Sequence, residues 1–131
     1  MQFETVPLAS LLAAIGGGLL VGVERERSHA GSGVRAAAGV RTFALAALTG
    51  AVGAMLGSVG LALGAIAVIA FALAGYRAGH RDDPGLTTEF ALVLTFLLGA
   101  LVLSTPQLAA GLFVVLAGLL AAKQALHRFT R

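Results

Sequence analysis

The chain lacks cysteine and tryptophan and has few charged residues for its 131-residue length. The absence of cysteine excludes disulfide bonds and thiolate metal sites. Only 11% of the residues are charged, whereas a soluble domain carries about a quarter. So few charged side chains cannot cover a water-facing surface, and the composition therefore excludes an ordinary soluble domain.

Apolar and small residues take the place of the missing charges. Hydrophobic residues make up 58% of the chain, and 18 residues are glycine. Small residues suit membrane helices, because they let helix backbones approach closely. The composition predicts an all-α integral membrane protein with the lipid bilayer as its surroundings. The sequence pI near 10.7 is then interpreted as a topology signal, and no nucleic-acid partner is expected.

Three long windows contain no charged residue: residues 5–23, 42–76 and 90–122, with 19, 35 and 33 residues. One membrane crossing needs about 20 apolar residues. The second window has a turn signal at Gly57–Gly60, and the third has Pro106 near its middle, where a helix ends or begins. The windows predict one domain over residues 1–131, a bundle of about five transmembrane helices at 6–27, 37–57, 60–78, 84–104 and 107–127.

The basic residues predict the orientation of this bundle. Five crossings place all nine Lys and Arg residues on one side, which the positive-inside rule assigns to the cytoplasm. Glu4 precedes the first window and the sequence ERER follows it. This is the reverse of the charge order in a signal peptide. We therefore expect a multi-pass protein of a bacterial-type inner (plasma) membrane, with its N-terminus outside and its C-terminus in the cytoplasm.

Several charges are expected inside helix ends. The second and third windows are too short for two full crossings each, so the helices must continue past the charges that flank them. Glu24, Arg41, Arg77 and Glu89 then lie in terminal helical turns near the cytoplasmic headgroups. One interpretation pairs these charges within the chain, for instance Glu24 with Arg41. The other is a polar site that recognises a cation, and the two are compatible.

Glu89 is the most informative of these positions. Asp83 and Pro84 are typical of a helix start, and Thr87, Thr88 and Glu89 follow within about two turns. A carboxylate near a helix N-terminus is favoured by the helix dipole, which by itself explains Glu89. Hydroxyl and carboxylate oxygens are also the ligands that Mg²⁺ and Ca²⁺ prefer.

Glycines four residues apart predict how the helices pack. The candidate packing positions are Gly18, Gly22, Gly53 and Gly57. Packing within the chain is the simpler interpretation, and packing between subunits is the other. Five short helices enclose little interior, so we expect a homodimer. The aromatic residues Phe43, Phe71, Phe90, Phe96 and Phe113 are expected to face lipid or to pack between helices.

An enzymatic function is not expected. The chain has no candidate Ser–His–Asp set, and its three histidines, His29, His80 and His127, are far apart in loops or the tail. The GSG stretch at Gly31–Gly33 lacks the following Lys-Ser or Lys-Thr of a phosphate-binding loop.

Three segments resemble the membrane domain of the MgtC/SapB family: GGGLLVGVERER, GVRTFALAALTGAVGAML and LTTEFALVLTFLLGAL. The third segment is most similar to members in which a second hydrophobic domain follows. The chain differs from the best-known members because it stops at LHRFTR, and no soluble C-terminal domain is expected. The residues that match the three motifs are Gly22, Glu24, Arg25, Glu26, Gly39, Arg41, Thr42, Thr88 and Glu89.

The resemblance implies a magnesium-related function. A transport or homeostasis role for a cation, with Mg²⁺ or another divalent ion as substrate and no resident cofactor, would use a cytoplasmic-side polar site. Glu24 and Glu89 would contact the metal ion there. The alternative is a regulatory membrane protein without transport, which uses its glycines to bind another membrane protein and its arginines to bind anionic lipid. The predicted ion or polar site comprises Glu24, Arg25, Glu26, Arg41, Thr42, Thr88 and Glu89.

Overall fold

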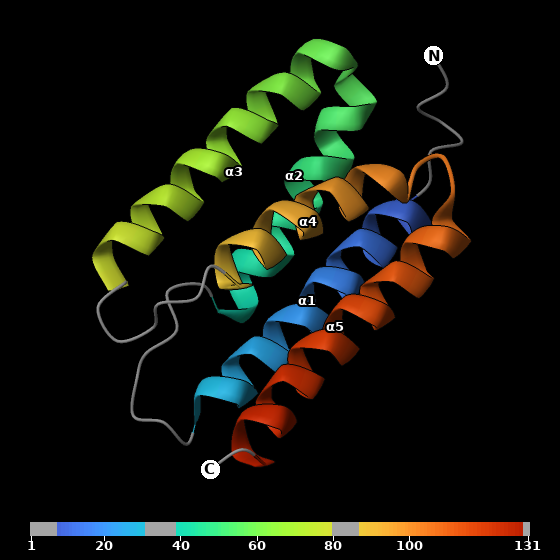
Figure 1. Cartoon of the computed structure of the whole chain (residues 1–131). Coiled ribbons are helices and arrows are strands. Elements are labelled where there is room, and N and C mark those ends of the chain that lie inside the picture. The colour runs from blue at the N-terminus through green and yellow to red at the C-terminus, as the bar shows by residue number, and fades with distance from the viewer. Residues whose placement is uncertain (1–7, 31–38, 80–86, 130–131) are drawn as a thin grey trace.

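The computed structural model describes residues 8–30, 39–79 and 87–129. These residues form five helices and no strand (Figure 1), which confirms the all-helical class and the predicted number of helices. The predicted ends differ from the observed ends by a few residues, and the predicted start at Asp83 and Pro84 lies outside the described residues. The helices are α1 Leu8–Ala30, α2 Val40–Leu56, α3 Ser58–Gly79, α4 Thr87–Leu101 and α5 Pro106–Phe129.

The two long windows divide into one short and one long helix each. Helix α2 has 17 residues and α3 has 22, while α4 has 15 and α5 has 24. Gly57 alone separates α2 from α3, and its φ of 101° is a left-handed conformation that favours glycine. Pro106 begins α5, where its missing N–H costs no helical hydrogen bond. Gly57 is therefore a turn residue, as the signal at Gly57–Gly60 predicted, and its predicted role in helix packing is not seen, because a Cβ atom there would meet no other described helix within 4 Å.

The charges that flank the windows do lie within helices. Glu24 is in α1, Arg41 is the second residue of α2, Arg77 is in the last turn of α3, and Glu89 is in the first turn of α4. By length and composition, the stretches Leu8–Arg27 in α1 and Ser58–Gly75 in α3 are long and apolar enough to cross a membrane. The apolar parts of α2, α4 and α5 are shorter.

The helices form a bundle with α3 at its edge. Helix α1 packs on α2, α4 and α5, and α2 also packs on α4. Within the described residues, α3 contacts α2 and α4 but neither α1 nor α5 (Figure 1). The chain order brings the ends of α1 and α3 and the starts of α2 and α4 to one end of the bundle.

Phenylalanine side chains divide into a buried and an exposed set. Phe43, Phe96 and Phe113 are buried in the core, whereas Phe71 and Phe90 are each 72% exposed. The ring of Phe113 lies against Gly17 of α1, and the ring of Phe96 lies against Gly64 of α3. Within the core, the rings of Phe96 and Phe113 thus occupy the space left by glycines on neighbouring helices.

The α1–α2 crossing depends on two of the predicted packing glycines. A Cβ atom at Gly18 would lie 2.6 Å from the Phe43 carbonyl oxygen, and one at Gly22 would lie 2.6 Å from the Cα atom of Val40. Gly53 contacts α3, where a Cβ atom would lie 3.1 Å from the Gly60 carbonyl oxygen. Gly18, Gly22 and Gly53 therefore face helices of the same chain.

The α2–α4 crossing depends on glycines that are not among the predicted packing positions. A Cβ atom at Gly50 would collide with the backbone of Phe96, and one at Gly99 would collide with the backbone of Ala47. In contrast, a Cβ atom at Gly16, Gly111 or Gly118 would have no other atom within 4 Å.

Candidate functional site

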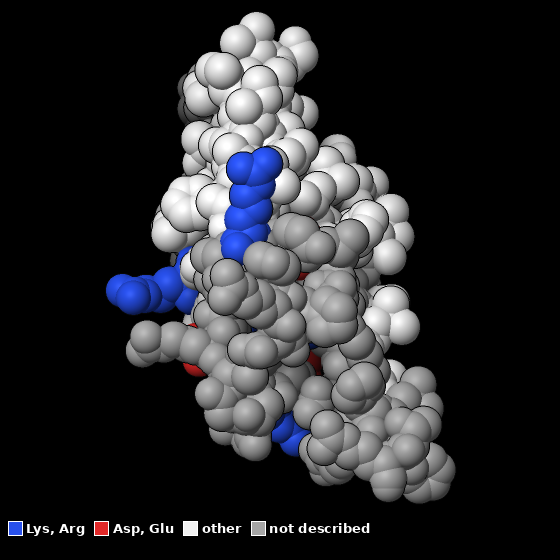
Figure 2. Space-filling model, turned by 60° about the vertical axis from the view of Figure 1, so that its left-hand side comes forward, with Lys and Arg blue, Asp and Glu red and all other residues white. Residues whose placement is uncertain are grey.

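The described charged side chains gather at the loop end of the bundle. In Figure 2 the blue and red side chains lie in the middle and lower parts of the molecule, and the upper part is white. The charged residues whose side chains the structure describes are Glu24, Arg25, Glu26, Arg27, Arg41, Arg77 and Glu89. This end contains the predicted polar site, so the partners of each charged side chain decide what the site can do.

Arg25 belongs to the packed interior of this end. Helix α1 buries Ala14, Gly18, Val21 and then Arg25, at the spacing of four, three and four residues that defines one helix face. Arg25 is only 5% exposed. A guanidinium group carries five N–H donors, and its burial is costly unless those donors are satisfied. Arg25 therefore constrains how the end of α1 packs.

Glu24 is paired within its own helix. Its Oε1 atom lies 3.6 Å from Nη1 of Arg27, the two side chains being 16% and 78% exposed. The suggested pairing of Glu24 with Arg41 is wrong, because the ion pair forms with the residue one turn along α1 and not with α2. An ion pair with one partner this exposed contributes about 0–1 kcal/mol, so the pair with Arg27 by itself adds little to stability.

Glu26 closes the start of the next helix. The N-cap of α2 is Gly39, which has no side chain to accept a hydrogen bond. The backbone N–H of Val40 instead donates to Oε2 of Glu26 at 3.1 Å. A carboxylate at a helix N-terminus also interacts favourably with the helix dipole. Glu26 thus connects the end of α1 to the beginning of α2.

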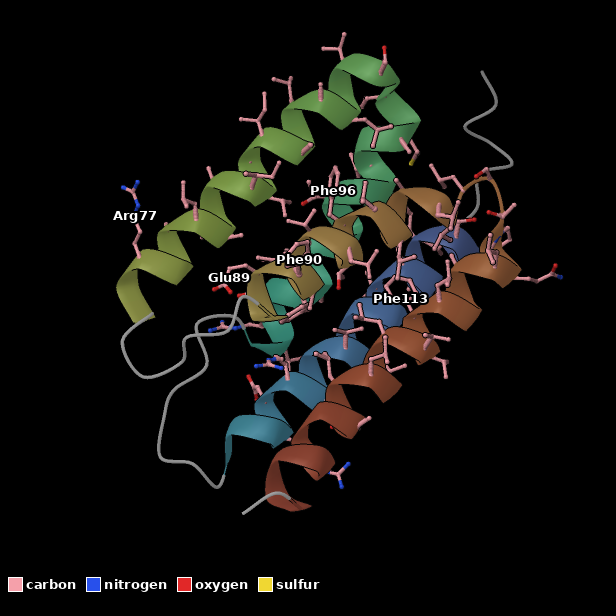
Figure 3. The ribbon with its side chains drawn as sticks, viewed as in Figure 1. Arg77, Glu89, Phe90, Phe96 and Phe113 are labelled. Atoms are coloured by element: carbon pink, nitrogen blue, oxygen red, sulfur yellow. The ribbon has the colours of Figure 1, made fainter. Side chains whose placement is uncertain are left out.

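Glu89 is half-buried in the first turn of α4. It makes no hydrogen bond or ion pair with any of the described residues. Arg41 is exposed and likewise has no such partner there. In Figure 3 the Arg77 side chain, near the end of α3, extends away from Glu89. Among the described residues, the Glu89 carboxylate is therefore the one at the loop end of the bundle without a partner.

Two of the predicted site residues, Thr42 and Thr88, carry hydroxyl groups. Thr42 is half-buried in α2. Thr88 lies in the first turn of α4, and its side chain is outside the described residues. Thr95 is fully buried, and its hydroxyl donates to the Ala91 carbonyl oxygen at 2.7 Å, so it is satisfied within its own helix. In the described ranges, no three His, Cys, Asp or Glu side chains come together.

The sequence patterns did not reveal the role of Glu26 as a cap. Local capping signatures place the cap within a few residues of the helix that it closes, whereas Glu26 lies 14 residues before Val40. Gly39 was the available signal, because a helix whose N-cap residue is glycine needs its cap from elsewhere.

The fold and the site together define a class of protein: a small, strongly apolar, all-helical bundle with its described charges at one end. A protein-family model described as the MgtC family matches residues 11–129, which include every predicted site residue. The chain therefore belongs to the MgtC family, a family of membrane proteins, and this membership supports a magnesium-related role. No curated protein and no solved structure showed a significant match to the chain.

Proposed function

We propose that this protein takes part in the transport or homeostasis of a cation, with Mg²⁺ favoured, through a polar site at the cytoplasmic end of the bundle. It would be a multi-pass protein of a bacterial-type inner membrane, with its N-terminus outside and its C-terminus in the cytoplasm. Membership of the MgtC family supports the magnesium-related role. The distribution of basic residues between the helices supports the orientation.

The state of Glu89 is the observation that carries this proposal. Glu24 is paired with Arg27, and Glu26 accepts a hydrogen bond from Val40. Glu89 has no such partner among the described residues and is half-buried. Mg²⁺ keeps several waters and is usually bound through one or two carboxylates. One carboxylate without a partner among the described residues therefore suits a hydrated cation that is held weakly enough to leave again.

The arginines at the same end of the bundle would limit the affinity of this carboxylate. Arg25 is buried and Arg41 is exposed at the same end of the bundle. Their positive charge repels a divalent cation and thereby favours its release, which transport requires as much as binding. Glu24 and the hydroxyl groups of Thr42 and Thr88 would add oxygen ligands.

We also propose that the functional unit is a homodimer. The buried ring of Phe96 fills the space between α4 and α3 next to Gly64, and the buried ring of Phe113 fills the space between α5 and α1 next to Gly17. A bundle with a packed interior supports a cation pathway that forms between two copies.

A flux measurement tests the transport function. Purified protein is reconstituted into liposomes that contain a fluorescent Mg²⁺ indicator, and Mg²⁺ entry is compared with empty vesicles. We expect entry above the empty-vesicle rate, and a decrease of about tenfold for Glu89→Gln, which corresponds to about 1.4 kcal/mol. The reason is that glutamine keeps the shape of the side chain and removes its negative charge.

The matched control is Phe90→Leu, at the exposed neighbour of Glu89, which should keep the wild-type flux. If intact, correctly oriented protein gives no flux above empty vesicles, the transport function is wrong. If Glu89→Gln transports as well as the wild type, the site is elsewhere.

A regulatory protein without transport is the second candidate function, favoured by the exposed Arg41 and Arg77. Exposed arginines at a membrane surface attract anionic lipid headgroups. In this case no variant would carry Mg²⁺, and Arg41→Ala with Arg77→Ala would lower the anionic lipid that co-purifies with the protein. The glycines suggested as its partner-binding face, Gly18 and Gly22, pack against α2, so a partner protein would have to bind elsewhere.

A further inference from the structure

At the junction between α1 and α2, the N-cap residue of α2 has no side chain to accept a hydrogen bond, and a carboxylate of α1 supplies the cap instead. Gly39, the N-cap of α2, makes no side-chain hydrogen bond. Oε2 of Glu26 accepts the Val40 N–H at 3.1 Å. The first helical hydrogen bond of α2 follows directly, since the Phe43 N–H donates to the Gly39 carbonyl oxygen at 3.1 Å. The first turn of α2 thus begins on a side chain of α1.

The conformation of Gly39 does not explain why this position is glycine. Its φ of −109° and ψ of −163° are extended values that any residue adopts. What distinguishes the position is its surroundings, because a Cβ atom at Gly39 would occupy the place of the Glu26 carboxylate oxygen. The glycine therefore leaves the space in which the carboxylate lies.

Close backbone packing brings the two helices together at this point. Gly22 lies one turn before Glu26 in α1, and a Cβ atom there would lie 2.6 Å from the Cα atom of Val40. Gly22 and Glu26 thus contact the same residue of α2. Arg41 follows Val40 and has no hydrogen bond or ion pair with the described residues, so its place depends on the backbone that begins α2.

We propose that Glu26 is a positioning residue: with Gly39 it forms a carboxylate clamp that sets the first turn of α2 and thereby places Arg41 at the charged end of the bundle. The clamp goes beyond the proposed function and does not depend on it, because it holds whether or not a cation is transported. In this arrangement Glu26 stabilises the α1–α2 junction, and Glu89 is the described carboxylate that has no partner among the described residues.

The length and the charge of the side chain can be separated by two conservative substitutions. Glu26→Gln keeps the reach and an acceptor oxygen but removes the charge, whereas Glu26→Asp keeps the charge and shortens the reach by one methylene. We expect amide hydrogen exchange of residues 40–43, measured in nanodiscs, to stay near wild type in Glu26→Gln. In Glu26→Asp and Glu26→Ala it should rise about fivefold, the effect of losing a typical cap.

Gly39→Ala supplies the other half of the test. The added methyl group displaces a carboxylate at the end of a flexible side chain, so this variant should show the same rise in exchange as Glu26→Ala. The double variant, with Glu26→Ala and Gly39→Ala, should be no worse than Glu26→Ala alone, because the carboxylate that the methyl group displaces is gone. If the two substitutions acted independently, their effects on the exchange rate would instead multiply in the double variant.

Spin labels measure the positioning itself. The chain has no cysteine, so Val23→Cys in α1 and Leu45→Cys in α2, both at exposed positions, give a single labelled pair. The distance distribution between them should broaden in Glu26→Asp and stay narrow in Glu26→Gln. Exchange at residues 52–56, at the far end of α2, should not change in either variant.

Several outcomes would overturn the clamp. They are unchanged exchange in Glu26→Ala, effects of Glu26→Ala and Gly39→Ala that multiply, or a reversed order in which Glu26→Asp resembles the wild type and Glu26→Gln does not. Each of them leaves the flux test of Glu89 unaffected, so failure of the clamp and failure of the transport function are distinguishable.

Discussion

Gly99→Ala should destabilise this protein severely, whereas the same substitution at Gly118 should leave it intact or stabilise it. A Cβ atom at Gly99 would lie 2.7 Å from the carbonyl carbon and 2.8 Å from the Cα atom of Ala47. These are backbone atoms of α2, which cannot yield unless the two helices move apart. The expected loss exceeds the ~1–3 kcal/mol that is typical of overpacking with side chains.

The control position is exposed on α5, and a Cβ atom at Gly118 would have no other atom within 4 Å. Alanine is the better helix former by ~1 kcal/mol, so the two substitutions should change stability in opposite directions. The measurement is the free energy of unfolding by denaturing-detergent titration, together with the monodisperse fraction in size-exclusion chromatography. Equal effects at the two positions would contradict the observed α2–α4 crossing.

Phe96→Ala should cost about 3 kcal/mol, at the lower end of the range for large-to-small substitutions in a core. Phe96 is 2% exposed and its ring lies against Gly64 and α3. Removal of the ring leaves a cavity between α2, α3 and α4, because the backbone contact of Phe96 with Gly50 prevents α4 from closing the gap.

Phe90→Ala provides the comparison within the same helix. Phe90 is 72% exposed, and lipid or detergent replaces its contacts, so the change should stay within about 0.5 kcal/mol. Thermal unfolding of both variants in one detergent checks the difference. If Phe90→Ala destabilises the protein as much as Phe96→Ala, the side of α4 that carries Phe90 is buried in the native assembly. Cross-linking would then test whether the second copy of the proposed homodimer covers this side of α4.

Much of the fold could be predicted, because each helix leaves a local mark in the sequence. Uncharged windows show where apolar helices lie, and Gly57 and Pro106 divide two of the windows. The unequal lengths of α2 and α3 could not be predicted, since the GSVG stretch allows several turn positions. The chain turns at its first glycine, where φ is 101°.

The candidate site was predictable in place but not in its pairings. The window lengths put Arg41, Arg77 and Glu89 in terminal helical turns, as observed, whereas Glu24, predicted in the last turn of α1, lies more than one turn before its end. Their partners depend on which helix faces they occupy. Glu24 therefore pairs with Arg27 along α1 and not with Arg41 across to α2, and Glu26, which no local signature marked as a cap, closes α2.

By itself, the sequence determined the class of the protein, because a chain with 58% hydrophobic and 11% charged residues has too few polar side chains to cover a soluble surface. It also determined the number of helices and the segments that contain the charges. Only the tertiary structure decided which glycines contact a backbone, which phenylalanines are buried and which carboxylate keeps no partner among the described residues. These properties depend on the rotation of each helix about its axis, and that rotation is set by close packing between segments far apart in the sequence.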